Sequence, residues 1–348
     1  MAGVRGAMPV RVGLIGCGTI AYWSHLRALQ QLKGVTLAAA ADPDPAARAR
    51  ASSMVRGPIH DQPDELLLAD IDAVVISAPT RFHAELTVAA ARAGKHVYVE
   101  KPLATTANEA RTIVDVVAQS HVVATVGFNY RHHTAHQRGR ALLKSGRIGK
   151  VRAVQSVFCE PSPPETMPEW KRRRGSGGGA LLDLASHHID LLRWFLDDEV
   201  ATVDARITSS RTEHDGATLA LTMREGVRAQ MYVSFCAGPA DFFEFIGETG
   251  TLRVDRHRVL PQLQVARLPR YGVRPAWSFP TVSEAAVWAR RLLQPSYQPS
   301  YRRALHAFFQ RIGGEAVHMA TVEDGERSLA VVLAAEESAQ RNAPVAVP

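Results

Sequence analysis

The sequence has few of the features that mark secreted, zinc-bound or membrane-inserted chains. Only three cysteines occur in 348 residues, and the odd number and wide separation of Cys17, Cys159 and Cys236 argue against a disulfide framework or a zinc site. No run approaches the ~20 apolar residues of a membrane span, and residues 1–9 lack the apolar core of a signal peptide. We therefore expect a cytoplasmic protein that is neither exported nor inserted into a membrane.

Acidic residues are scarce in one stretch of an otherwise mixed sequence. Between Arg253 and Arg311 the only acids are Asp255 and Glu284, and the whole chain carries a formal net charge of +7. The arginines there alternate with Leu, Val, Pro and aromatic residues, and no nucleic-acid-binding module accompanies them. This pattern favours a solvated or subunit-facing surface over a nucleic-acid partner.

A histidine cluster near the middle of the chain also lacks acidic neighbours. His132, His133 and His136 have no carboxylate at metal-ligand spacing. We predict no metal site.

The most informative stretch is residues 10–21, an apolar strand that breaks into a glycine turn and then a helical pattern. Gly16 permits the sharp turn, Gly18 lets a pyrophosphate approach the backbone, and Ala21 allows close helix packing. An ordinary tight turn would also explain the glycines. However, the next apolar run ends in Asp42, near the ~20-residue spacing at which a carboxylate binds an adenosine ribose. Together these features predict dinucleotide binding. A carboxylate repels a 2′-phosphate, which favours NAD over NADP.

The first third of the chain alternates strand and helix patterns, which predicts a parallel sheet with helices on both faces. Ligands of such sheets bind at the carboxyl ends of the strands. One apolar strand ends near Ser77 and Pro79, and another ends at Glu100 and Lys101. The fold alone does not explain a lysine there, and we predict that it donates to a substrate oxygen that develops alkoxide charge.

His83, at a predicted helix start beyond Pro79, has two interpretations. Its imidazole either lines the cofactor or only caps and packs the helix.

The pattern changes after Asn129. Consecutive β-rich runs separated by turn signals predict a mostly antiparallel sheet with an open face. We therefore expect domains at residues 1–128 and 129–348. Residues 261–299, with Trp277, Phe279 and Trp288, are expected to form an irregular lid or interface arm before two final helices.

Two further clusters in the second half each have a structural and a functional interpretation. The basic run from Trp170 to Arg174 is either a solvated loop or a loop in which Trp170 and Lys171 contact a polyol or a phosphorylated sugar. Asp183 and His187 are four residues apart in an amphipathic helical pattern, so they share one face. They are either a cap and a core pair or a pair that acts on a ligand.

These motifs together resemble the Gfo/Idh/MocA oxidoreductases. The resemblance is carried by the turn sequence Gly-Cys-Gly-Thr-Ile-Ala, by Asp42, by the 94–102 run that ends Val-Glu-Lys-Pro, by residues 126–129, and by Asp-Leu-Ala-Ser-His at 183–187. The motifs occur in the family's order and span nearly the whole chain. The family consists of sugar and cyclitol dehydrogenases with a Rossmann domain followed by an open-sheet α/β domain, and its members form dimers or tetramers through that sheet.

The resemblance identifies Asp183 and His187 with the family's Asp-x-x-x-His catalytic element, so the predicted catalytic residues are Lys101, Asp183 and His187. We expect His187 to act as general base, Lys101 to hold the alkoxide, and Asp183 to orient His187 or a substrate hydroxyl. A proton relay mainly through Lys101 remains an alternative. The predicted cofactor-binding residues are Gly16, Gly18, Thr19, Ile20, Asp42, Ser77, Pro79, His83, Glu100, Lys101 and Asn129. The predicted substrate-binding residues are Lys101, Arg131, Trp170, Lys171, Asp183 and His187.

Three functions fit this resemblance. The first is an NAD-dependent dehydrogenase or ketoreductase acting on a sugar, aminosugar or cyclitol. The second is an NAD-using glycoside hydrolase, which would release a free sugar with no net NADH. The third is a non-catalytic nucleotide-sensing regulator, which normally loses the lysine or the histidine. The presence of Lys101, Asp183 and His187 favours an enzyme.

Overall fold

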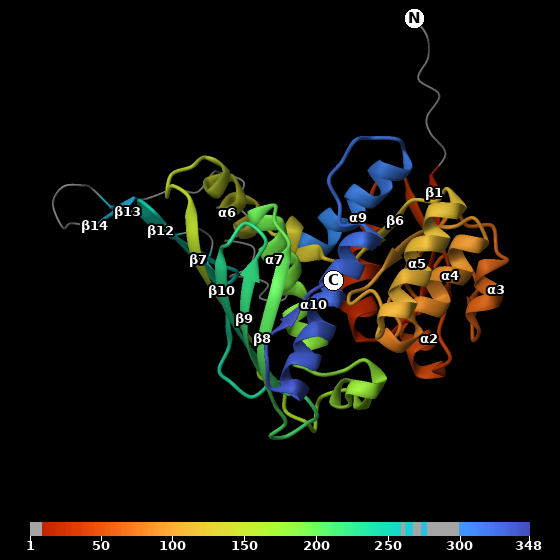
Figure 1. The fold of residues 1–348 in the computed structure, drawn as a ribbon. Helices are drawn as coiled ribbons and strands as arrows, with labels where there is room; N and C mark the ends of the chain where they lie inside the picture. Colours follow the sequence, from red (N-terminus) through yellow and green to blue (C-terminus); the bar gives the residue numbers. More distant parts are fainter. Residues whose placement is uncertain (1–8, 259–261, 267–272, 277–298) are drawn as a thin grey trace, which may run out of the picture. The chain divides into compact units, whose positions relative to one another are not determined.

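The computed structural model describes residues 9–258, 262–266, 273–276 and 299–348 (Figure 1). The chain divides into two compact units. Unit 1 comprises Met1–Asn129 and Gln298–Glu326, and unit 2 comprises Tyr130–Tyr297 and Arg327–Pro348. The chain therefore returns to unit 1 after most of unit 2, which a division into two consecutive segments does not anticipate.

Unit 1 is built on a six-stranded sheet in the order β3-β2-β1-β4-β5-β6. Every neighbouring pair is parallel, so the predicted parallel sheet of a Rossmann domain is confirmed. β4 is buried along its whole length, as expected for a strand covered on both faces. The strands are β1 (Val10–Ile15), β2 (Val35–Ala41), β3 (Ile59–His60), β4 (Ala73–Ile76), β5 (His96–Val99) and β6 (Ala124–Val126).

Helices connect these strands and complete the core of unit 1. Asp44 caps α2, and a reciprocal Thr106–Glu109 capping box starts α5. Leu305 and Phe308 of α9 are fully buried in the same hydrophobic cluster as Tyr98, which is why this late segment belongs to unit 1. The helices are η1 (Ala21–His25, a π-helical turn), α1 (Leu26–Gln30), α2 (Pro45–Ala51), α3 (Pro63–Leu67), η2 (Thr80–Phe82), α4 (His83–Arg92), α5 (Ala107–Ser120), η3 (Asn129–His132, which crosses the boundary of the units) and α9 (Pro299–Ile312).

Unit 2 contains a nine-stranded sheet in the order β14-β13-β12-β11-β7-β10-β9-β8-β15. Only the β7–β10 pair is parallel, so the prediction of a mostly antiparallel sheet is confirmed for the described residues. The strands are β7 (Val151–Cys159), β8 (Val200–Thr208), β9 (Gly216–Met223), β10 (Arg228–Ser234), β11 (Ala240–Gly247), β12 (Gly250–Asp255), β13 (Gln262–Ala266), β14 (Val273–Ala276) and β15 (Val345–Ala346).

The prediction that residues 261–299 form an irregular insertion is wrong for two short parts of it. β13 pairs with β12, and β14 pairs with β13, so both continue the ladder at one edge of the sheet. Trp277, Phe279 and Trp288 lie outside the described residues.

One face of this sheet is covered and the other is open. η6 packs on β7 and β10, and α6 packs on β12. Along β10, Ala229, Met231 and Val233 are buried, whereas Tyr232 between them is exposed. The helices of this part are α6 (Thr134–Lys144), η4 (Glu169–Arg172), η5 (Arg174–Ser176), η6 (Leu181–Ala185, a second π-helical turn), α7 (Ser186–Leu196) and α10 (Val322–Arg341, which begins in unit 1).

A search of the described helices for one able to cross a bilayer, by length and apolar character, found none.

Candidate active site

The glycine turn that follows β1 is open where a dinucleotide would approach it. Gly16 has φ +89°, and a Cβ there would lie 2.7 Å from the backbone of Ser77 and Ala78, so only glycine fits. A Cβ on Gly18 would meet no atom within 4 Å. The helical bonds begin where Tyr22 N–H donates to the Gly18 carbonyl at 2.9 Å. Because a helix start leaves earlier N–H groups without helical acceptors, the turn suits a pyrophosphate.

Asp42 lies at the end of β2 and binds the glycine turn directly. Its Oδ2 accepts from the Cys17 backbone N–H at 2.6 Å, and its Oδ1 accepts from the Asp44 N–H at 2.8 Å. Arg48 donates to the backbone carbonyls of Asp42 and Pro43. This nearby guanidinium is therefore engaged with carbonyl groups. A fixed carboxylate at this place suits a ribose with free hydroxyls and opposes a 2′-phosphate.

Burial, with the nearby Asp42 as a second cause, raises the pKa of Cys17 to about 12. The thiol therefore stays protonated and is a packing group of the turn.

The segments after β4 and β5 meet at the same edge of the sheet through His83. One ring nitrogen, Nδ1, lies 2.7 Å from the Pro102 carbonyl, and Nε2 lies 2.9 Å from the Ala78 carbonyl. Burial lowers the pKa of His83 against the effect of these two carbonyl partners. His83 therefore braces the ends of β4 and β5, and its contact with a cofactor stays a prediction. Lys101, half-buried, lies in the braced segment, next to the cis Lys101–Pro102 bond.

Asn129 follows β6, and its side chain faces α9. Its Nδ2 donates to the Ser300 hydroxyl at 3.0 Å, and the residue is buried. The side-chain amide of Asn129 thus has a partner within unit 1. Contact of Asn129 with the cofactor stays a prediction, and so does cofactor contact of Thr19, Ile20, Ser77 and Pro79.

In unit 2, the structure brings together two residues that the sequence analysis treated separately. Lys171 Nζ lies 2.7 Å from Asp183 Oδ2, and both side chains are mostly buried. Lys171 also lies over the ring of Trp170, 5.6 Å from its centre. The carboxylate of Asp183 is therefore held by a cation from the η4 segment. Asp183 lies in the π-helical turn η6, a feature that is frequent at functional sites.

His187, in the first turn of α7, stacks on an aromatic ring that the sequence analysis missed. The ring centres of His187 and Tyr130 are 4.1 Å apart, and their planes are inclined by 11°. Both residues are almost completely buried. Stacking of this kind fixes the plane of the imidazole, which a proton-transfer group requires.

A buried charged group lies behind this stack. Arg256 donates to Asp241 at 2.5 Å, and its guanidinium lies 4.9 Å from the centre of the Tyr130 ring. His188 contacts Asp241 at 3.1 Å and the Ser156 hydroxyl at 2.6 Å. Burial alone would raise the pKa of Asp241, but Arg256 and His188 outweigh it and hold the pKa well below its usual range. No motif in the sequence marked these residues, since they are distant in the chain.

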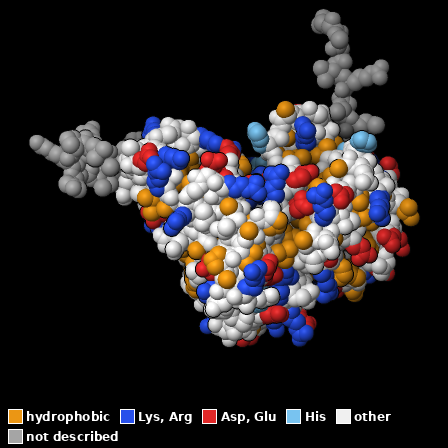
Figure 2. Space-filling view, in the orientation of Figure 1, with side chains coloured by type: hydrophobic (Ala, Val, Ile, Leu, Met, Phe, Trp, Pro, Cys, Tyr) orange, Lys and Arg blue, Asp and Glu red, His pale blue; other side chains and the backbone are white. Residues whose placement is uncertain are grey.

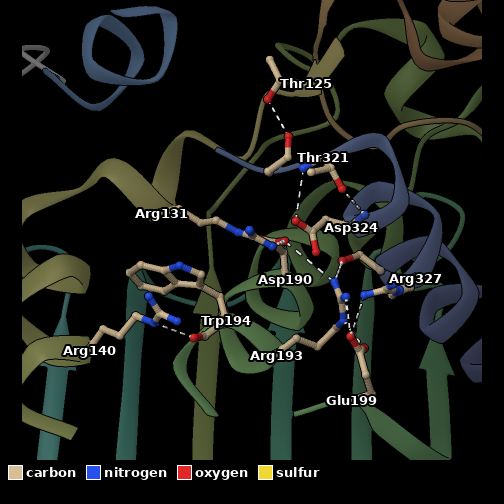
Figure 3. Close-up of polar contacts among 12 residues, drawn as sticks. Thr125, Arg131, Arg140, Asp190, Arg193, Trp194, Glu199, Thr321, Asp324 and Arg327 are labelled. Carbon is tan, nitrogen blue, oxygen red and sulfur yellow. Dashed lines mark hydrogen bonds and ion pairs between the residues drawn. The ribbon is translucent and has the colours of Figure 1, made fainter. Parts of the chain in front are cut away.

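Arg131, a predicted substrate-binding residue, forms a bidentate ion pair with Asp190 at 2.9 and 2.5 Å. Figure 3 shows this pair continuing through Arg193 and Glu199 to Arg327. The pair fastens α7 to the start of unit 2. Substrate binding by Arg131 stays a prediction.

No group of three or more His, Cys, Asp and Glu side chains that could hold a metal ion occurs among the described residues.

The parallel sheet, the open glycine turn and Asp42 define a dinucleotide-binding α/β protein. Comparison with known proteins identifies the family. The oxidoreductase family with an NAD-binding Rossmann fold matches residues 10–128, and the GFO/IDH/MocA C-terminal domain matches residues 136–253. The chain belongs to the GFO/IDH/MocA family.

The relatives of this chain are reductases and dehydrogenases. It is 34% identical over 254 residues to a dTDP-3,4-didehydro-2,6-dideoxy-alpha-D-glucose 3-reductase of Actinomadura kijaniata, covering 72% of this chain and 76% of the relative. It is 32% identical over 335 residues to a 1,5-anhydro-D-fructose reductase of Ensifer adhaerens, covering 94% and 96%. A levoglucosan dehydrogenase solved with NADH has the same fold, with a TM-score of 0.86, 24% identity and coverage of 97% and 99%. The chain is thus an NAD-dependent oxidoreductase acting on CH–OH groups, and the predictions of family and cofactor are confirmed.

His136 of α6 provides a test of the buried environment around Tyr130. Its Nδ1 lies 2.9 Å from the Tyr130 carbonyl, and burial lowers the pKa of its imidazole to about 4. In the unfolded chain the imidazole has its usual pKa near 6.5, so it binds a proton more strongly there than in the folded chain. The free energy of unfolding therefore falls as the pH falls below that pKa. From pH 7.5 to 5 this group should account for a loss of about 2 kcal/mol.

We expect His136→Asn, which can keep a donor to Tyr130, to lose about 2 kcal/mol less stability than the wild type over that pH interval. Urea denaturation at both pH values measures this difference. His306→Asn, at an exposed position of α9, serves as the control. An unchanged pH dependence in His136→Asn would show that His136 is not a buried neutral group.

Proposed function

We propose that this enzyme transfers a hydride reversibly between nicotinamide and a secondary alcohol carbon of a sugar, aminosugar or cyclitol. The observation that carries the proposal is the position of Lys101, which lies two residues beyond the end of β5, at the same edge of the sheet as the glycine turn. The names of the relatives support a carbohydrate substrate, since they include reductases of a nucleotide-linked deoxysugar and of anhydrofructose, and an inositol 2-dehydrogenase.

The cofactor and three side chains each have a separate role in the proposed reaction. Bound NAD supplies the hydride acceptor at its nicotinamide ring. Lys101 donates a hydrogen bond to the reacting oxygen and stabilises the alkoxide that forms. His187 removes the hydroxyl proton, because an imidazole exchanges protons near neutral pH. Asp183, held by Lys171, orients His187 or a neighbouring substrate hydroxyl.

The open face of the unit 2 sheet supports a homodimer or homotetramer. Tyr232, Val157 and Phe242 form a row across β10, β7 and β11, and Ile246 lies further along β11 on the same face. Tyr232 and Ile246 are 41% and 44% exposed, which is unfavourable for large apolar side chains in water. A monomer mass by light scattering would exclude this assembly.

We propose no nucleic-acid partner for this protein. Figure 2 shows Lys and Arg side chains among Asp and Glu over the visible face, without a continuous basic band. The three cysteines are free, which suits a reducing cytoplasm.

A substrate panel with deuterated cofactor tests the reaction. We expect NADH deuterated at C4 to transfer deuterium to one ring carbon of a keto-sugar, aminosugar or inosose, seen by mass spectrometry of the product. Release of a free sugar from a glycoside with no net NADH change would instead identify the hydrolase. NADH binding without turnover of any panel member would identify a nucleotide-sensing protein.

Lys101→Met tests the role of the lysine. We expect kcat to fall about 10²- to 10⁴-fold, because the alkoxide loses its donor, while the Kd for NADH stays within about threefold. Stopped-flow absorbance measures the first quantity and NADH fluorescence the second. Lys95→Met is a matched control, because Lys95 precedes the same strand and donates to the Ile71 carbonyl at 2.8 Å. Wild-type turnover in Lys101→Met would remove the lysine from the mechanism.

A further inference from the structure

A buried histidine–glutamate pair links the helix after the glycine turn to the segment that holds Lys101. His25 Nε2 lies 2.8 Å from Glu100 Oε1, and the two side chains are 0% and 10% exposed. His25 is the last residue of η1, the turn that starts at Ala21. Glu100 directly precedes Lys101. This hydrogen bond therefore connects the helix after the glycine turn to the segment that holds Lys101.

The carboxylate of Glu100 is fixed from several directions. Its second oxygen, Oε2, accepts from the Lys101 backbone N–H at 3.2 Å. The Glu100 N–H donates to the Ile76 carbonyl at 2.9 Å. A Cβ on Gly127 would lie 3.0 Å from Oε1. The backbone at Gly127 therefore packs closely against the carboxylate. The position of the carboxylate therefore helps to set where the Lys101 backbone begins.

The imidazole of His25 is held by aromatic edges. The ring centres of Tyr98 and Tyr301 lie 5.6 and 5.4 Å from that of His25, both in edge-on arrangements. Its Nδ1 is buried and has no hydrogen-bond partner among the described residues. Among the described residues, the imidazole of His25 thus makes its side-chain hydrogen bond through Nε2, to Glu100.

Packing alone does not account for a polar pair at this place. Removing a carboxylate from water is unfavourable, and apolar side chains of similar volume often fill such a site with equal or greater stability. The pair instead joins the turn that binds the pyrophosphate to the lysine that meets the substrate.

We propose that His25 and Glu100 are positioning residues that couple occupancy of the glycine turn to the placement of Lys101. A pyrophosphate bound at the turn fixes η1, His25 holds the Glu100 carboxylate, and that carboxylate holds the Lys101 N–H. The proposal rests on the role of Lys101 given above.

The replacement His25→Met/Glu100→Met tests this coupling, since it exchanges the polar pair for apolar side chains of similar length. We expect the melting temperature to be kept or raised and the Kd for NADH to stay within about threefold. We expect kcat to fall about 10²-fold, because the lysine is misplaced. In the Lys101→Met background the same replacement should lower kcat no further.

Hydrogen exchange gives a second readout that does not depend on activity. In the wild type, NADH should slow exchange both in the glycine-turn segment and at the Lys101 amide. In the double replacement, NADH should still protect the turn but no longer protect the Lys101 amide. The single variant His25→Gln, which keeps a donor toward Glu100, should retain most of the protection and most of the wild-type kcat.

A second histidine–glutamate pair of the same unit, His60–Glu65, supplies the control; its contact is 2.7 Å and its glutamate is exposed. His60→Met/Glu65→Met should leave kcat and both protection patterns unchanged. The coupling is refuted if His25→Met/Glu100→Met keeps wild-type kcat and Lys101 protection. A large loss of melting temperature or of NADH affinity would equally refute it, because the pair would then be structural. Wild-type turnover in Lys101→Met would separately refute the proposed role of the lysine.

Discussion

The parallel direction of all six strands in unit 1 is the constraint on which the cofactor site depends. Because the strands run the same way, the segments after β1, β2, β4 and β5 leave the sheet at one edge. Contacts between backbones and side chains then fix these segments to one another. A side chain on Gly16 would clash with the backbone at Ser77, Asp42 binds the Cys17 N–H, and His83 braces the ends of β4 and β5. The glycine turn is therefore held by its neighbours as well as by its own sequence.

In unit 2, buried contacts hold the helical segment that carries Asp183 and His187. Lys171 holds Asp183, and Tyr130 stacks on His187. Arg131 fastens the same helix through Asp190. Burial strengthens the two ion pairs, because water competes less for their charged groups. A side chain that transfers a proton needs such a fixed orientation more than it needs exposure.

The periodicity of apolar residues and the short sequence motifs predicted much of this arrangement, because both are local properties of the chain. The alternation of apolar runs predicted the two sheets, and the glycine spacing with Asp42 predicted the dinucleotide turn. Pairings between distant residues were not predictable. His25 and Glu100 are 75 residues apart, and Arg131 and Asp190 are 59 apart. The π-helical turns η1 and η6 were also missed, because their hydrogen-bond pattern departs from the 3.6-residue helical period. Strands β13 and β14 were missed because they form by pairing with the neighbouring strands of the sheet.

We propose that Lys101 and His187 act in the same proton and hydride transfer. The most direct test is a double-mutant cycle on the single-turnover rate of NADH oxidation with a saturating substrate from the panel. Residues that act in one step give strongly non-additive losses. We therefore predict that Lys101→Met and His187→Gln each lower the rate, and that the double variant is slower than the slower single variant by less than about tenfold. Losses that multiply in the double variant would show that the two residues act in separate steps, and a wild-type rate in His187→Gln would show that His187 takes no part in the reaction.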